Sequence, residues 1–176
     1  SVSKRFSACG ARVGCVVTRN KELQQALLKF CQSRLSVATV DQIGAAALYS
    51  VDHEFFRQCK EEYRKRRDLV VRLLRDIPGV KVEEPMGAFY VMASLPVDDA
   101  DKFCEWCLSS FSWKDEHTPE GCAGETVMMA PASGFYSDSS LGKNQVRLAY
   151  VLKKEDIQRS LFILEKALEA YPGRVK

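Results

Sequence analysis

A lysine near the start of the sequence stands among residues that can bind an anion. Lys4 follows Ser1 and Ser3, and Arg12 comes eight positions later. A lysine amine condenses with carbonyl groups once it has lost its proton. Because a free lysine has a pKa of about 10.4, it needs a buried or cation-rich pocket to react near neutrality. The two hydroxyls and the planar arginine fork are donors that suit a phosphate dianion.

Two glycines on either side of Arg12 complete this N-terminal cluster. Gly10 and Gly14 predict either a close approach of the backbone to a ligand or a positive φ. A carbonyl-reactive lysine beside a phosphate cradle is the arrangement that pyridoxal phosphate requires. The segment 1–14 therefore predicts a pyridoxal phosphate site, with Lys4 as its catalytic residue.

Three blocks of sequence together resemble a known family. They are Ser-Val-Ser-Lys followed by Gly-Ala-Arg-Val-Gly within 1–14, Pro-Met-Gly-Ala-Phe-Tyr at 85–90, and Asn-Gln-Val-Arg-Leu-Ala-Tyr at 144–150. Their order and spacing resemble class I aminotransferases of the aspartate aminotransferase type, which are fold type I pyridoxal phosphate enzymes. The resemblance covers essentially the whole chain and is to the C-terminal part of such an enzyme.

The resemblance implies a role for each residue of the N-terminal cluster. Lys4 would hold pyridoxal 5′-phosphate as a Schiff base and then act as a general base at the substrate. Ser1, Ser3 and Arg12 would bind the cofactor phosphate. The family's groups for the ring nitrogen, ring hydroxyl and ring face are not in this sequence. The alternative is a non-catalytic fragment or binding module that keeps the fold without turnover.

The resemblance also implies a substrate site. Arg147 would bind the substrate α-carboxylate through two parallel hydrogen bonds, a geometry that lysine cannot reproduce. Gly87 and Phe89 would lie at the mouth of the site, and 132–137 resembles the family's substrate-side loop. The plain alternatives are a turn glycine, a core aromatic and a surface arginine on an edge strand. The implied substrates are an amino acid, of the aspartate type, and a 2-oxo acid, in a homodimer.

The composition is that of an ordinary soluble globular protein, with 46% hydrophobic and 28% charged residues and a net charge of +3. A net charge this small does not favour a nucleic-acid or membrane partner. The basic segment 60–67 is the one candidate for nucleic acid, but Glu61 with Lys65 and Glu62 with Arg66 predict a solvated helix face. The sequence has neither a long apolar run nor a signal region, so we expect a cytoplasmic protein.

Seven cysteines, an odd number, predict buried and reduced thiols. Cys104 and Cys107 have the spacing of a redox or metal pair. They lie in a helical pattern without a second pair or suitably spaced histidines, so packing is favoured and no metal is expected.

The periodicity predicts an α/β protein of fold type I, represented by its C-terminal portion. We expect 1–51 to be a remnant of the large cofactor-binding domain, 52–77 a long interdomain helix, and 78–176 a small α+β domain. The expected strands are 13–18, 80–82, 88–92, 127–131 and 145–152. The expected helices are 21–32, one opened by a Thr39–Gln42 capping box, 52–77 capped by Asp52, 98–108 and 155–171. In the last strand, Arg147 is expected on the face opposite Val146 and Tyr150.

Overall fold

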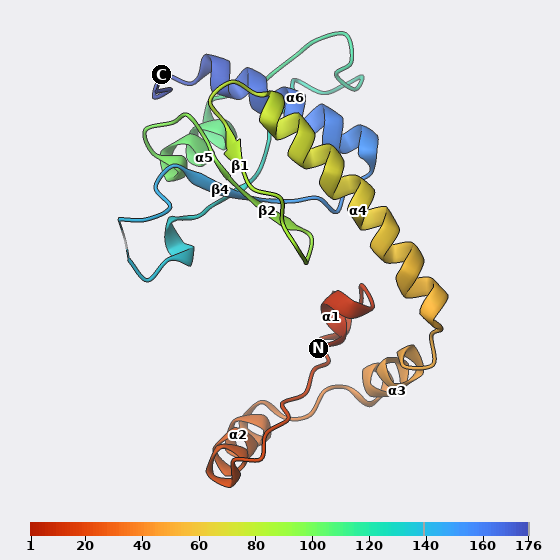
Figure 1. Cartoon of the computed structure of the whole chain (residues 1–176). Coiled ribbons are helices and arrows are strands. Elements are labelled where there is room, and N and C mark those ends of the chain that lie inside the picture. The colour runs from red at the N-terminus through yellow and green to blue at the C-terminus, as the bar shows by residue number, and fades with distance from the viewer. Residues whose placement is uncertain (139, 176) are drawn as a thin grey trace. The chain divides into compact units, whose positions relative to one another are not determined.

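The computed structural model describes residues 1–138 and 140–175, and the chain divides into two compact units (Figure 1). Unit 1 comprises Ser1–Arg57, and unit 2 begins at Gln58. The threefold division at 51/52 and 77/78 stays a prediction.

Unit 1 is helical and has a small core. Its elements are α1 (Val2–Arg5), the 3-10 turn η1 (Cys9–Ala11), α2 (Lys21–Arg34) and α3 (Thr39–Leu48), followed by the start of α4 (His53–Asp76). Val2, Phe6 and Ala45 are its buried residues, and the rings of Phe6 and Phe56 lie 5.6 Å apart. The backbone N–H of Val2 donates to the Val13 carbonyl at 3.1 Å, which joins α1 to the segment after η1.

Two expectations for unit 1 are wrong. Residues 13–18 form no strand, and Val16 and Val17 are 68% and 91% exposed. A strand needs a partner for its backbone groups, and the described part of unit 1 offers none. The capping box is also wrong, because Thr39 has already entered α3 and Ala38 stands at the cap without a side-chain bond. The Gln42 amide instead donates to the Val37 carbonyl at 2.7 Å.

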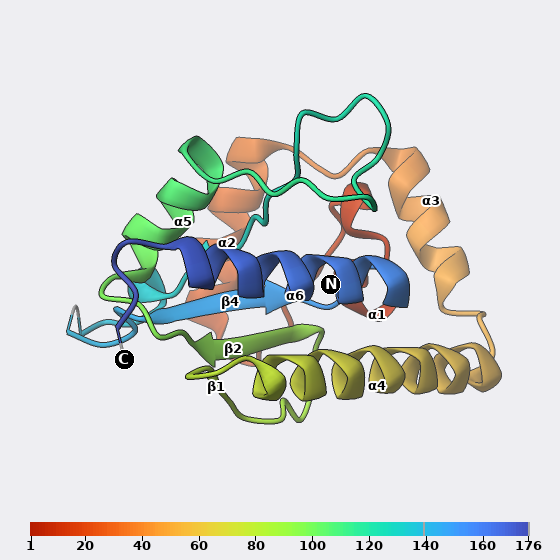
Figure 2. The same ribbon diagram turned by 90° about the horizontal axis from the view of Figure 1, so that it is seen from above.

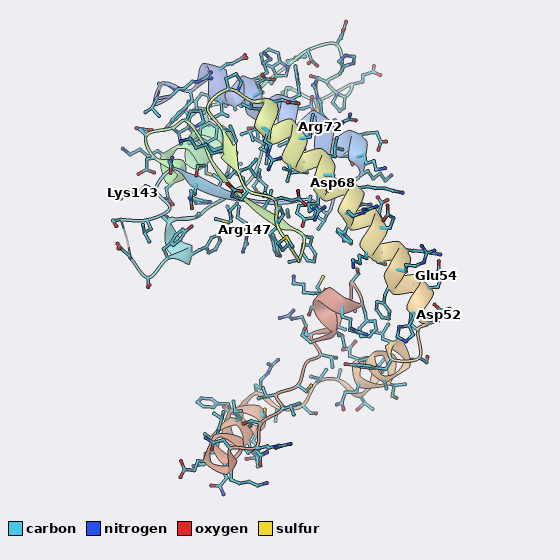
Figure 3. The ribbon with its side chains drawn as sticks, in the orientation of Figure 1. Asp52, Glu54, Asp68, Arg72, Lys143 and Arg147 are labelled. Atoms are coloured by element: carbon cyan, nitrogen blue, oxygen red, sulfur yellow. The ribbon has the colours of Figure 1, made fainter. Side chains whose placement is uncertain are left out.

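The long helix α4 begins and ends close to the expected positions. Asp52 caps it by accepting from the backbone N–H groups of Glu54 and Phe55, at 2.6 and 3.1 Å, at the helix start labelled in Figure 3. On its charged stretch, Glu62 pairs with Arg66 at 2.8 Å and Glu61 with Lys65 at 3.9 Å. The prediction of a charged face with i,i+4 pairs is therefore confirmed.

Unit 2 is built on a four-stranded antiparallel sheet of order β1-β2-β4-β3. Its strands are β1 (Lys81–Val82), β2 (Tyr90–Ser94), β3 (Ala130–Pro131) and β4 (Gln145–Ala149). The strands expected at 80–82, 127–131 and 145–152 are present but shorter, and the two edge strands have two residues each. The strand expected at 88–92 has the expected length but begins two residues later, at Tyr90. In the central ladder, Met92 lies opposite Arg147, and Ala93 lies opposite Val146.

Helices cover one face of this sheet. They are α4, α5 (Ala100–Ser109), which Asp99 caps, and α6 (Lys154–Ala170). Figures 1 and 2 show α4 and α6 running along the sheet, and their inner faces share one core with Val91, Ala93 and Val146. Alternate residues of β2 and β4, among them Met92 and Arg147, therefore lie on the face that these helices leave open.

An ionic cluster ties the 111–126 segment to α6. Arg159 donates to both carboxylate oxygens of Asp115, at 2.9 and 2.8 Å, and also to Glu125. Trp113 adds a hydrogen bond from Nε1 to Asp115 at 2.9 Å. The hydrogen bonds from Arg159 hold the pKa of Asp115 well below its usual range and lower that of Glu125. Sequence patterning gave no indication of this cluster, because its members are distant along the chain.

The cysteines are all free, but they are not all buried. Cys104 and Cys107 lie on the inner face of α5 and pack in the core. Burial raises their pKa values to about 11 and about 12. The packing role predicted for this pair is confirmed. The expectation of burial is wrong for Cys9, Cys15, Cys31 and Cys122, which are exposed because nothing in the described structure covers their helix or loop faces.

Among the described residues, no helix combines the length and apolarity that a membrane crossing demands. The same residues contain no cluster of three or more His, Cys, Asp or Glu side chains suited to a metal ion.

Candidate active site

The N-terminal cluster is organised by the first turn of helix. The Ser1 hydroxyl oxygen caps α1 by accepting from the Ser3 backbone N–H at 3.2 Å, and the Ser1 hydroxyl donates to that of Ser3 at 2.9 Å. Lys4 stands in the same turn, and its side chain is exposed in unit 1. The structure therefore brings the two predicted phosphate hydroxyls together beside the predicted catalytic lysine.

Arg12 joins η1 to the segment that lies against α1. The bond between Val2 and Val13 holds the segment after η1 against α1, and a Cβ on Gly14 would lie 3.6 Å from Ser1. The Arg12 guanidinium donates from Nη1 to the Cys9 carbonyl at 3.1 Å. Ser1, Ser3 and Arg12 thus belong to one local structure.

Of the two roles expected of Gly10 and Gly14, the positive φ is wrong, and the close approach of the backbone to a ligand stays a prediction. A Cβ on Gly10 would meet nothing within 4 Å, and the one on Gly14 would make only an ordinary contact. Neither glycine has a positive φ. Ser7 and Arg12 adopt that conformation instead, each with φ 54°.

The donor set fits the phosphate and the aldehyde of pyridoxal phosphate. It offers two hydroxyls, one guanidinium and one amine, and residues 1–14 contain no Asp or Glu to oppose an anion. Residues that would face the cofactor ring are not part of this cluster.

Arg147 occupies a different setting, on the open face of the sheet in unit 2 (Figure 3). Its Cζ lies 4.5 Å from the centroid of the Tyr90 ring and 4.5 Å from that of the Phe135 ring. No carboxylate within 1–138 or 140–175 forms a salt bridge with it. Because β4 lies between β2 and β3, the alternative of an arginine on an edge strand is wrong.

The turn before β2 contains Gly87 and leads into Phe89. Gly87 is exposed, and the positive φ of this turn, 59°, falls on Ala88. Phe89 is half-buried, and its ring lies 5.8 Å from that of Tyr63 and 4.8 Å from that of Tyr90. The ring of Phe89 therefore packs beside Tyr90, the aromatic partner of Arg147, and substrate contact by Gly87 and Phe89 stays a prediction.

Tyr90 and Phe135 were not singled out as site residues from the sequence. The alternation of β2 and β4 could have revealed Tyr90, which lies on the same sheet face as Arg147 two residues from its ladder partner. Phe135 belongs to the Ser-Gly-Phe-Tyr block, whose turn geometry cannot be read from periodicity.

The model of the family described as "Aminotransferase class I and II" matches residues 1–161. The chain belongs to this aminotransferase family. The match contains every candidate site residue, from Ser1 to Arg147. The fold is accordingly that of the fold type I pyridoxal phosphate-dependent aminotransferases.

Relatives with established names extend this assignment. An aspartate aminotransferase of Pyrococcus horikoshii is 32% identical over 173 residues, which is 96% of this chain and 40% of the relative. The structure of an aspartate aminotransferase from Thermotoga maritima is 29% identical with a TM-score of 0.72, covering 96% of this chain and 39% of that one. The chain thus spans about two fifths of the length of these relatives.

One structural neighbour contains a cofactor derivative. The α-aminoadipate aminotransferase LysN from Thermus thermophilus, complexed with N-(5′-phosphopyridoxyl)-L-leucine, has a TM-score of 0.73 and covers 92% of this chain and 39% of that one. At 23% identity, this likeness concerns the fold alone.

Proposed function

We propose that this chain supplies the cofactor lysine and the carboxylate-binding arginine of a pyridoxal phosphate-dependent aminotransferase. The observation that carries the proposal is the family match over 1–161, which includes a Lys4 cluster whose donors suit a phosphorylated aldehyde. Pyridoxal phosphate, when bound, withdraws electrons from the substrate Cα and so makes its proton acidic.

Lys4 would be the group that moves this proton. Its amine, once deprotonated and held near the substrate, would take the proton from the substrate Cα and would then be the acid that gives this proton back. Proton transfer by a positioned side chain contributes about 10²–10⁴-fold to a rate. The position of Lys4 in α1, beside the hydroxyls of Ser1 and Ser3, would fix the amine at the end of the cofactor that its aldehyde occupies.

Ser1, Ser3 and Arg12 would hold the phosphate. The two hydroxyls offer neutral donors, and the Arg12 guanidinium offers charge-assisted ones. In the described structure the Arg12 guanidinium donates to the Cys9 carbonyl, so phosphate binding would exchange a neutral acceptor for an anionic one. This exchange favours the phosphate, because the guanidinium and the phosphate carry opposite charges and attract each other beyond the hydrogen bond itself.

Arg147 would orient the substrate by its α-carboxylate. A planar guanidinium matches a carboxylate with two parallel N–H···O bonds, which fix both the position and the plane of the acid group. Holding a bound reactant in its reactive orientation can contribute up to roughly 7–11 kcal/mol to lowering a barrier. Gly87 and Phe89 would lie beside the substrate.

The finer assignments belong to the same proposal. An aspartate-type amino acid would be the donor and a 2-oxo acid the acceptor, which the relation to the Pyrococcus aspartate aminotransferase supports. The parent enzyme would be a cytoplasmic homodimer. The competing hypothesis is a non-catalytic fragment or binding module. The small core of unit 1 is the observation that speaks for it.

Borohydride reduction of the chain incubated with pyridoxal phosphate, followed by chymotryptic peptide mapping, tests the cofactor site. We expect a phosphopyridoxyl mass on the peptide that contains Lys4, and its loss in Lys4→Ala. Lys29→Arg, on the exposed surface of α2, is the matched control and should leave the labelling of Lys4 unchanged.

Labelling spread evenly over the exposed lysines, and unchanged by Lys4→Ala, would contradict the proposal. It would favour the non-catalytic alternative for this chain.

A further inference from the structure

Two aromatic rings approach the Arg147 guanidinium from the two flanks of β4. Tyr90 belongs to β2, which pairs with β4 on one side, and Phe135 closes the 3-10 turn η2 (Ser133–Phe135) that follows β3 on the other side. Both ring centroids lie 4.5 Å from Cζ, within the range of a cation–π contact. The guanidinium is thus held by rings rather than by a carboxylate.

The turn that carries Phe135 is fixed at several points. The Ala132 backbone N–H donates to the Gln145 carbonyl at 2.9 Å, and the Ser133 hydroxyl donates to Asp101 of α5 at 2.7 Å. The Tyr136 hydroxyl donates to the Gln145 side chain at 2.6 Å. These bonds fix η2 to α5 and β4, so the Phe135 ring is positioned even though it is 52% exposed.

The Tyr90 ring is positioned from its own side. Tyr90 lies opposite Ala149 in the ladder, and its ring packs against that of Phe89. The turn before it is held by Tyr150, whose backbone N–H donates to the Phe89 carbonyl at 3.0 Å and whose hydroxyl donates to the Ala88 carbonyl at 3.1 Å. The interior residue Tyr150 therefore fixes the start of β2.

We propose that Tyr90 and Phe135 are positioning residues that set the plane in which Arg147 presents its N–H groups to a carboxylate. This inference rests on the proposed substrate role of Arg147. An aromatic face attracts the guanidinium face and leaves the N–H edge available, whereas a salt bridge to an acid would occupy that edge. Arg147 is therefore pre-organised, and less rotational freedom is lost when a carboxylate binds.

The side-chain NMR signal of Arg147 tests the arrangement directly in the free chain. The ¹⁵Nε–¹Hε signal is assigned by its loss in Arg147→Lys. We expect an upfield ring-current shift in the wild-type chain that decreases in Phe135→Leu and in Tyr90→Leu. Phe135→Tyr, which keeps a ring at the same position, should retain the shift.

Titration with 2-oxoglutarate, followed at the same signal, tests the consequence for binding. Phe135→Leu should raise the dissociation constant about two- to fivefold, the size of one exposed cation–π contact. Phe135→Tyr should restore wild-type affinity, which a general loss of structure would not allow. Met92→Leu, opposite Arg147 in the ladder but without a ring, is the matched control and should change neither measurement.

The two proposals fail in different ways. Equal Arg147 shifts in the wild type, Phe135→Leu and Tyr90→Leu would overturn the positioning role of the rings. Loss of the shift in the leucine variants, together with no response of wild-type Arg147 to 2-oxoglutarate, would leave the ring contacts established and overturn the carboxylate role in the proposed function. The amide spectrum of α6 checks that each variant is folded.

Discussion

At the scale of single residues, the cluster of Arg159, Asp115 and Glu125 is the strongest polar interaction between the 111–126 segment and α6. The three side chains are only 20–22% exposed, and Arg159 binds Asp115 through both carboxylate oxygens. Partial burial makes such a pair stronger than a surface ion pair, and it also leaves the partners poorly solvated if one is removed. The cluster should therefore contribute to stability in a way that depends on pH.

We expect Arg159→Met to lower the midpoint of urea unfolding at pH 7. The pKa values of Asp115 and Glu125 are depressed in the folded chain, so their contribution is present above the unfolded values, roughly 3.9 and 4.3, and is lost as the pH falls through the folded values. The difference between wild type and variant should therefore shrink progressively below about pH 5. Urea titrations at several pH values measure it.

Lys166→Met is the control for that experiment. Lys166 is on the same helix, pairs with the half-exposed Glu169 at 2.8 Å and lies 5.9 Å from the centroid of the Trp113 ring. Any loss of stability in this variant should therefore come mainly from packing and change little with pH. A difference for Arg159→Met that stays constant from pH 7 to pH 3 would show that lost packing, and not the ion pairs, is responsible.

At the scale of elements, sequence patterns predicted the faces of unit 2 well. The alternation along 145–152 placed Val146 and Tyr150 inside and Arg147 outside, as found. The helix expected over 155–171 is present as α6, and its residues at helical spacing, such as Ile157 and Leu164, are buried. Periodicity is enough to predict these buried faces because the helices and strands that cover them belong to the same unit and share one core.

The same reasoning was less informative for unit 1. The periodicity of α2 predicted the helix itself, but its apolar residues Leu23 and Phe30 are 45% and 73% exposed. Periodicity identifies the apolar face of an element and carries no information about what covers it. The β-branched run at 13–18 likewise indicates a strand only where a partner strand exists.

The turn before β2 offers a test of backbone conformation. Ala88 has φ 59°, a conformation that costs an alanine roughly 1–2 kcal/mol and a glycine almost nothing. Glycine also gains entropy in the unfolded chain, and this offsets part of the relieved strain. We therefore expect Ala88→Gly to raise the free energy of unfolding by up to about 1 kcal/mol. Urea unfolding measures this change.

Ala123→Gly is its matched control. Ala123 is exposed in a loop and is not among the non-glycine residues with positive φ, so the substitution should be neutral or slightly destabilising. A loss of stability in Ala88→Gly as large as that in Ala123→Gly would mean that Ala88 is not strained.

At the scale of the whole molecule, the two units differ in the size of their cores. Unit 1 buries three apolar residues together, whereas the unit 2 core draws on three helices and the sheet. Regions with few buried apolar contacts open at a low free-energy cost. Hydrogen exchange should therefore distinguish the units.

We expect amides of α2 to exchange much faster than those of β2, β4 and α6. Mass spectrometry of peptides after pulses of deuterium labelling measures this, with α5 as an internal reference for a helix packed in a core. Slow exchange in α2, comparable to that in α5, would contradict the expectation and show that its apolar face is covered in solution.

The shortness of the outer strands β1 and β3 also determines how copies of this chain can associate. An exposed strand edge is a template on which another chain can pair, but β1 and β3 offer only two residues each, and one of those in β3 is Pro131, which has no N–H to donate. Growth of the sheet from one molecule to the next is therefore disfavoured at both ends. The exposed apolar residues of α2, such as Leu23 and Phe30, offer a different mode of self-association, one that buries side chains and forms no intermolecular ladder.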